Sequence, residues 1–124
     1  MAEPEGAAGW LTTHVLDTAL GVPAQSLRFE LFRLENGQRE RLASLKTNHE
    51  GRCEEPLLSG SAFRTGVYEL TFYVGEYLRA QGHVHAEPLF LDEVPIRFGV
   101  NDPSTHVHVP LLISPFGYTT YRGI

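Results

Sequence analysis

Two His-X-His motifs, His83-Val84-His85 and His106-Val107-His108, are the clearest candidates for chemistry in this sequence. In an extended strand this spacing places both imidazoles on the same face. Such a pair can bind a metal ion, or it can exchange protons near neutral pH because the unperturbed pKa of histidine is about 6.5. Histidine is also commonly an ordinary exposed side chain. A metal site would need a third ligand and partners that orient the ligands, so the motifs alone leave all three interpretations open.

Arg52 follows Gly51 in the turn-forming stretch TNHEGR. An arginine in this position is commonly a solvated charge, but the bend can also aim its guanidinium into a cleft. There it would stabilise the negative charge that develops on an attacked carbonyl oxygen. The sequence has no G-x-S-x-G motif, no glycine-rich phosphate loop and no motif around its one cysteine, Cys53. It therefore does not predict a nucleophilic triad or nucleotide chemistry.

The segments that must position these side chains have a period of two, which is typical of strands. Leu27, Phe29 and Leu31 alternate with polar residues, which predicts a strand with one buried and one solvated face, and Asn36-Gly37 favours a hairpin turn after it. One short helix is predicted at 76–80. Further strands are predicted at 11–16, 41–47, 65–74, 94–100, 107–113 and 118–121. Seven or eight short strands predict an all-β fold, an antiparallel sandwich or a small barrel.

The alternation also predicts which side chains share a face. If Val107 and Val109 face the core, then His106 and His108 lie on the opposite face of their strand. By the same reasoning, His14 faces away from the core on the first strand. The histidines could therefore meet at a surface or at an interface between subunits.

Length and composition restrict the class of protein. A chain of 124 residues is about one domain long, and we expect residues 1–10 to be a flexible tail and 11–124 a single domain. The net charge of −5 argues against binding to nucleic acid or anionic lipid. No apolar run approaches the roughly 18–20 residues of a membrane span. With one cysteine and no recognised secretion signal, the expected compartment is the cytoplasm.

Four segments of the sequence closely resemble the transthyretin-like 5-hydroxyisourate hydrolases. They are LTTHVLDTALGVPA (11–24), TNHEGR (47–52), RTGVYELTFYVGEYL (64–78) and HVPLLISPFGYTTYRG (108–123). The resemblance implies a transthyretin-like sandwich of two four-stranded sheets with one short helix. It also implies a homotetramer with active sites at the dimer–dimer interface. The implied reaction opens the ring of 5-hydroxyisourate, a small-molecule product of urate oxidation, without a cofactor or metal.

The same resemblance implies the site residues. His14 and His108 correspond to the histidines that remove a proton from water, and Arg52 corresponds to the group that stabilises the oxyanion. Tyr121, Arg122, Gly123 and Ile124 correspond to the segment that binds substrate. The sequence departs from the family at Val107, where an aromatic residue is common, and at Ile124, where the hydrolases have serine.

Two alternatives to a metal-independent hydrolase remain at this stage. The first is a transthyretin-type protein that binds a small molecule without catalysis, because enzyme and carrier share one fold. The second is a metal hydrolase that uses the two His-X-His motifs. The polar residues His14, Arg52 and His108 favour the hydrolase over the carrier.

Overall fold

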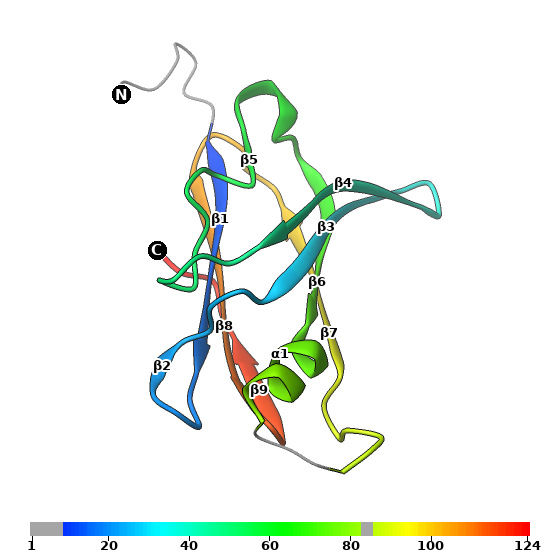
Figure 1. Ribbon diagram of the computed structural model, residues 1–124. Helices are drawn as coiled ribbons and strands as arrows, with labels where there is room; N and C mark the ends of the chain where they lie inside the picture. The colour runs from blue at the N-terminus through cyan, green and yellow to red at the C-terminus, as the bar shows by residue number, and fades with distance from the viewer. Residues whose placement is uncertain (1–8, 83–85) are drawn as a thin grey trace.

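The computed structural model describes residues 9–82 and 86–124 and consists mainly of β-strands in two facing sheets (Figure 1). The expected tail falls almost entirely in residues 1–8, and the motif His83-Val84-His85 also lies outside the described residues. The helical segments are η1, a 3-10 turn (Gly60–Ala62), and α1 (Val74–Gln81). The strands are β1 (Trp10–Asp17), β2 (Val22–Pro23), β3 (Arg28–Glu35), β4 (Gln38–Lys46), β5 (Leu58–Ser59), β6 (Gly66–Tyr73), β7 (Glu93–Val100), β8 (His106–Ser114) and β9 (Gly117–Thr120).

One sheet has the strand order β2-β1-β8-β9, with the two-residue strand β5 paired to β1, and the other has the order β4-β3-β6-β7. The predicted fold class, a transthyretin-like sandwich of two four-stranded sheets with one short helix, is confirmed apart from this additional short strand. All neighbouring strands are antiparallel except β1 and β8, which run parallel. The parallel pair joins segments from opposite ends of the described sequence.

The core lies between the sheets and follows the predicted alternation. Leu11 and Val15 of β1 are fully buried, as are Leu111 and Ile113 of β8. From the other sheet come the buried side chains of Phe29, Leu31, Leu70 and Phe72. Each fully buried side chain of this size contributes about 1.5–3 kcal/mol, so the inner faces stabilise the fold and leave the outer faces available for other roles.

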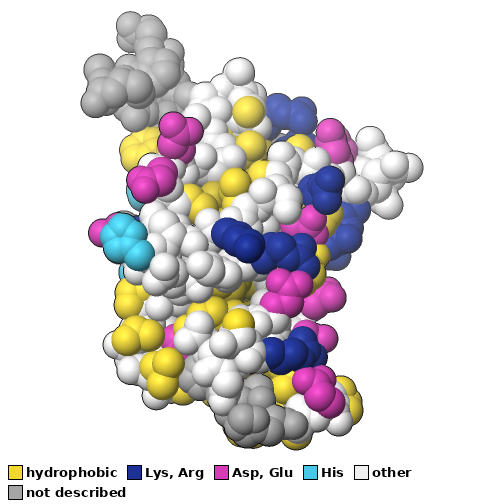
Figure 2. Space-filling view, viewed as in Figure 1, with side chains coloured by type: hydrophobic (Ala, Val, Ile, Leu, Met, Phe, Trp, Pro, Cys, Tyr) yellow, Lys and Arg dark blue, Asp and Glu magenta, His cyan; other side chains and the backbone are white. Residues whose placement is uncertain are grey.

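The outer face of β3 differs from the prediction of a solvated face. Glu30 is buried there, because the Tyr73 hydroxyl donates a hydrogen bond to it at 2.5 Å and the Arg41 guanidinium donates another at 2.9 Å. These two donors lower the pKa of the Glu30 carboxyl. Figure 2 shows basic and acidic side chains next to one another on the side of the molecule where β3 and β4 run. Long side chains from neighbouring strands therefore cover positions that a single strand's pattern marks as exposed.

The helix α1 covers one end of the sandwich and is longer than predicted by two residues at its start and one at its end (Figure 1). The buried Tyr77 hydroxyl donates a hydrogen bond to the carboxylate of Asp17 at 2.8 Å, which ties the helix to the end of β1. Burial of the Tyr77 hydroxyl disfavours its charged form and raises the pKa of Tyr77, and the Asp17 carboxylate raises it further. Among the described residues, no helix is long and apolar enough to cross a membrane.

Candidate active site

The parallel pairing of β1 and β8 brings the candidate histidines onto one outer face. Thr12 lies opposite His108 and His14 lies opposite Pro110 in the strand register. Their neighbours Leu11, Val15 and Val107 point into the core, so the predicted alternation is confirmed on both strands. His14 and His108 are half-buried, and His106 is exposed. The face therefore presents imidazoles from β1 and β8 side by side.

Arg52 reaches this face because the 47–52 turn is fixed against β1. The Asn48 side chain accepts hydrogen bonds from the backbone N–H groups of Glu50 and Arg52, which closes the turn. Gly51 has a φ of +77° and its carbonyl accepts a hydrogen bond from the Val15 N–H at 2.8 Å. A Cβ at Gly51 would lie 2.4 Å from the Val15 carbonyl oxygen. Glycine is therefore required both by the backbone conformation and by the close approach.

A cleft of about 390 Å³ lies between Arg52 and the histidines of β8. Its lining includes Arg52, His106, His108 and Ile124, together with Thr12, Thr13, Cys53, Glu55 and Leu57. His14 does not line the cleft itself, but it is close enough to influence the His108 charge. The structure thus brings together five residues proposed from the sequence, namely His14, Arg52, His108, Gly123 and Ile124. In the view of Figure 2, the visible histidine side chains lie on the side where β1 and the C-terminus run.

The environment of His14 favours a neutral imidazole. Its Nε2 is 2.9 Å from the carbonyl oxygen of Glu50. A carbonyl oxygen can only accept, so Nε2 carries the proton and Nδ1 has the free lone pair. Partial burial lowers the pKa of His14 and the Arg52 guanidinium lowers it further, against smaller raising effects from Glu50. A neutral ring with a defined free nitrogen can accept a proton.

His108 is held by β1 on one side and by the final residues on the other. The hydroxyl oxygen of Thr12 lies 2.7 Å from Nδ1 of His108. On the other side, the Gly123 N–H donates to the His108 carbonyl at 2.8 Å, and a Cβ at Gly123 would lie 2.6 Å from the imidazole Cδ2. Burial lowers the pKa of His108, and the nearby His106, Arg52 and His14 lower it further. The imidazole is therefore neutral over a wider pH range than a free histidine.

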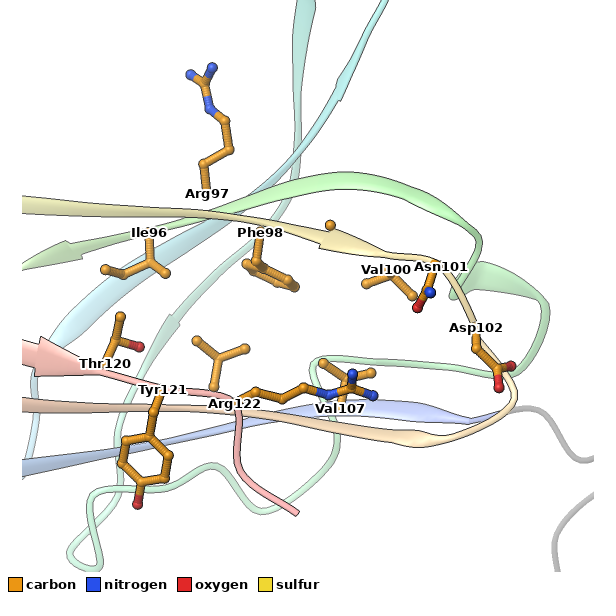
Figure 3. Close-up of a pocket in the computed structure, with 12 residues that line it drawn as sticks. Ile96, Arg97, Phe98, Val100, Asn101, Asp102, Val107, Thr120, Tyr121 and Arg122 are labelled. Carbon is orange, nitrogen blue, oxygen red and sulfur yellow. The ribbon is translucent and has the colours of Figure 1, made fainter.

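The remaining predicted binding residues divide between two places. Gly123 continues the β8–β9 register, so that Tyr121 falls on the same outer face as His108. Figure 3 shows the Tyr121 ring pointing away from a second pocket of about 290 Å³ between β7 and β8. The Arg122 side chain lines that second pocket and extends toward Asp102, whose pKa it helps to lower after the larger effect of Ser104. The structure does not bring the Arg122 side chain to the histidine cleft.

Among the cleft residues that the sequence-based site omitted, His106 is the one with a titratable imidazole. The His-X-His motif had placed it beside His108, but the resemblance gave a role only to the second histidine. In the structure, the indole ring of Trp10 stacks on the His106 ring with centroids 4.6 Å apart and an interplanar angle of 14°. Within the described ranges, no group of three His, Cys, Asp or Glu side chains is arranged to hold a metal ion.

Comparison with known proteins gives consistent results. The model of the HIUase/Transthyretin family matches residues 11–123. The chain is 56% identical to a 5-hydroxyisourate hydrolase from Mesorhizobium japonicum over 124 residues, which covers 99% of both chains. The chain also matches the protein in a crystal structure of (S)-allantoin synthase, with 45% sequence identity and a TM-score of 0.90. This match covers 95% of this chain but only 44% of that one.

A structure of sea bream transthyretin in complex with thyroxine has a TM-score of 0.82 at 27% identity, covering 92% of this chain and 94% of that one. Enzyme and carrier are thus both close in fold, and the sequence is much nearer to the enzyme. The family match extends over nearly the whole sequence, from β1 to the segment after β9. This chain belongs to the HIUase/Transthyretin family.

Proposed function

We propose that this protein hydrolyses 5-hydroxyisourate to 2-oxo-4-hydroxy-4-carboxy-5-ureidoimidazoline by opening its six-membered ring. The observation that carries the proposal is the meeting of Arg52 and His108 in one cleft, with His14 beside them. The identity of 56% to the Mesorhizobium japonicum hydrolase supports the same reaction. The two imidazoles and the guanidinium provide a proton acceptor and a fixed positive charge, which the hydrolysis of a cyclic amide requires.

In the proposed mechanism, His14 and His108 share the removal of a proton from the attacking water. The water oxygen bonds to the carbonyl carbon, and the carbonyl oxygen becomes an oxyanion. The free Nδ1 of His14 and the lowered pKa values of both rings support this role. General base assistance of this kind is worth about a hundred- to ten-thousand-fold in rate.

Arg52 is proposed to stabilise the oxyanion. Its charge already acts on both histidines, so the guanidinium lies on the side of the cleft where the reaction would occur. Loss of one such donor commonly costs about 3–4 kcal/mol of transition-state stabilisation. When the tetrahedral intermediate collapses, the carbon–nitrogen bond breaks and the ring nitrogen takes the proton held by an imidazolium. Protein groups and water supply every step, so the proposal invokes no cofactor or metal.

The residues Tyr121, Arg122, Gly123 and Ile124 are proposed to bind the substrate. Gly123 lies against His108 and Ile124 lines the cleft, and Tyr121 offers a hydroxyl on the same outer face. In this conformation the Arg122 side chain occupies the neighbouring pocket, so we assign its contribution to its backbone.

We further propose a homotetramer with the active sites at the dimer–dimer interface, located in the cytoplasm. The outer side of the β2-β1-β8-β9 sheet and its connecting turns expose several large apolar side chains, namely Leu20, Val22, Phe116 and Tyr121. Contact with another copy would bury this surface and narrow the open cleft. Light scattering coupled to size-exclusion chromatography measures the mass directly, and a monomer at assay concentration would refute the assembly.

A second candidate function is non-catalytic binding of a small aromatic molecule. The similarity to thyroxine-bound sea bream transthyretin supports it, and Ile124 makes the cleft more apolar than a serine would. The half-buried His14 and His108 beside Arg52 favour hydrolysis instead, because a carrier of apolar rings gains nothing from desolvating three polar groups.

The deciding experiment generates 5-hydroxyisourate from urate with urate oxidase and follows its decay by absorbance. We expect the decay to accelerate in proportion to protein concentration, with no effect of a chelator. Decay at the uncatalysed rate would refute the hydrolase and leave the carrier. Loss of activity with chelator would instead support a metal hydrolase.

A further inference from the structure

The hydroxyl group of Thr12 lies between two imidazoles. Its Oγ1 is 2.7 Å from Nε2 of His106 and 2.7 Å from Nδ1 of His108. The centroids of the two rings are 5.9 Å apart, and the ring planes are tilted by 52° to each other. The β1–β8 register fixes this arrangement, because Thr12 is opposite His108 and Trp10 is opposite His106. One oxygen atom therefore lies within hydrogen-bond distance of a nitrogen in each ring.

A single hydroxyl restricts the protonation of both rings. A hydroxyl group has one proton to donate, so it can donate to only one of the two facing nitrogens and must accept from the other. If His106 donates from Nε2, the hydroxyl donates to Nδ1 of His108, and neutral His108 carries its proton on Nε2. If His108 donates from Nδ1, its Nε2 has the free lone pair. The two states differ in whether His108 presents an acid or a base to the cleft that it lines.

The partner His106 is itself held in place. The Trp10 indole stacks on its ring at 4.6 Å, which fixes the plane of the imidazole and hence the direction of Nε2. A positive charge on this ring would lie over the indole face, where the ring quadrupole attracts cations. His106 is also the more exposed of the two histidines, so water stabilises a charge there better than on His108.

We propose that Thr12 is a positioning residue that couples His108 to His106 through a hydroxyl proton relay. This inference rests on the proposed hydrolase function and adds to it a route for the proton. When Nε2 of His108 takes the proton from water, its Nδ1 proton passes to Oγ1 of Thr12. The hydroxyl proton then passes to Nε2 of His106, and the positive charge ends on His106. The reverse transfer returns a proton through His108 for the departing ring nitrogen.

Substitutions separate the relay from a simple structural contact. Thr12→Val keeps the shape and removes the hydroxyl, whereas Thr12→Ser keeps the hydroxyl. His106→Phe keeps a ring for Trp10 to stack on and removes the nitrogen. The matched control is Thr18→Val. The hydroxyl of Thr18, just after the end of β1, donates a hydrogen bond to the Ile113 carbonyl of β8 at 2.9 Å. This bond lies away from the cleft.

We expect Thr12→Val to lower kcat by about a hundred-fold, the lower end of the range for lost proton-transfer assistance, with KM little changed. Thr12→Ser and Thr18→Val should retain the parent kcat. His106→Phe should match Thr12→Val, and the double variant should be no slower than either, because both changes remove one pathway. A parent-like kcat for either Thr12→Val or His106→Phe would overturn the relay. Since the two variants alter different residues, a folding defect in one leaves the other as the test.

A spectroscopic measurement tests the same link without substrate. Imidazole nitrogen-15 NMR near neutral pH should show one proton shared between the facing pair, with either Nε2 of His106 or Nδ1 of His108 protonated and the other not. Thr12→Val should abolish this complementarity. If both facing nitrogens of the parent were unprotonated, the relay would be wrong even in an active enzyme. If complementarity were present and the parent failed to accelerate the decay, the proposed function would be wrong and the hydrogen-bonded pair would stand.

Discussion

Replacing Gly51 with alanine tests whether the 47–52 turn holds Arg52 in its working position. The new Cβ would lie 2.4 Å from the Val15 carbonyl oxygen, whereas ordinary contact begins at 3.4 Å. To restore an ordinary contact distance between this Cβ and the Val15 carbonyl oxygen, the turn must withdraw from β1 by about 1 Å. Arg52 is the next residue and must move with it, away from His14. A misplacement of about 1 Å can cost about a hundred-fold in rate, so we expect kcat/KM to fall by that order.

The matched control is Gly37→Ala in the β3–β4 hairpin. Gly37 has a φ of +73°, close to the +77° of Gly51, but a Cβ there meets nothing within 4 Å. Both variants therefore carry the cost of a left-handed alanine, about 1–2 kcal/mol, and urea unfolding should show that loss in each. Only Gly51→Ala should also lose activity in the 5-hydroxyisourate decay assay. Equal kcat/KM values for the two variants would refute the idea that this close approach positions Arg52.

Three further predictions use the same assay. His14→Ala and Arg52→Ala should each lower turnover at least about a hundred-fold with an unchanged circular dichroism spectrum, and a variant at the parent rate would lose its assigned role. Because protonation removes a base and the pKa values of His14 and His108 are lowered, kcat/KM should persist as the pH falls past about 6.5; an acidic limb above that value would contradict the base assignment. Ile124→Ser should raise turnover by adding a hydroxyl to the cleft, and an unchanged rate would exclude a use for that group.

Local pattern was sufficient to predict most strands and the directions of their side chains. Val107 and Val109 are buried while His106 is exposed, as the period of two requires. The Asn36-Gly37 turn also forms as predicted, with positive φ at both residues. These features depend on neighbours in sequence, whose chemistry the sequence displays directly. The expectation for β3 was wrong because the cover over Glu30 comes from Tyr73 and Arg41 on the adjacent strands.

The assembly of the candidate site could not be predicted from local pattern for the same reason. Alternation indicates that His14 and His108 face away from the core, but it does not indicate that β1 and β8 are neighbours, or that they run parallel. The link from Thr12 to both histidines depends entirely on that register. Resemblance to a family supplied the missing long-range information for His14, Arg52 and His108. It did not indicate that Arg122 turns its side chain toward Asp102.

The division of the β1–β8 pair into two faces explains how one fold can hold either an enzyme or a carrier. The inner face contributes Leu11, Val15 and Leu111 to the core, and changes there would cost stability. Thr12 and His108 lie on the outer face, where substitution leaves the buried side chains untouched. An outer face of imidazoles and a guanidinium can move protons, whereas an apolar one can hold an aromatic ligand. The fold therefore determines where the site lies, and a few outward-facing residues determine what chemistry occurs there.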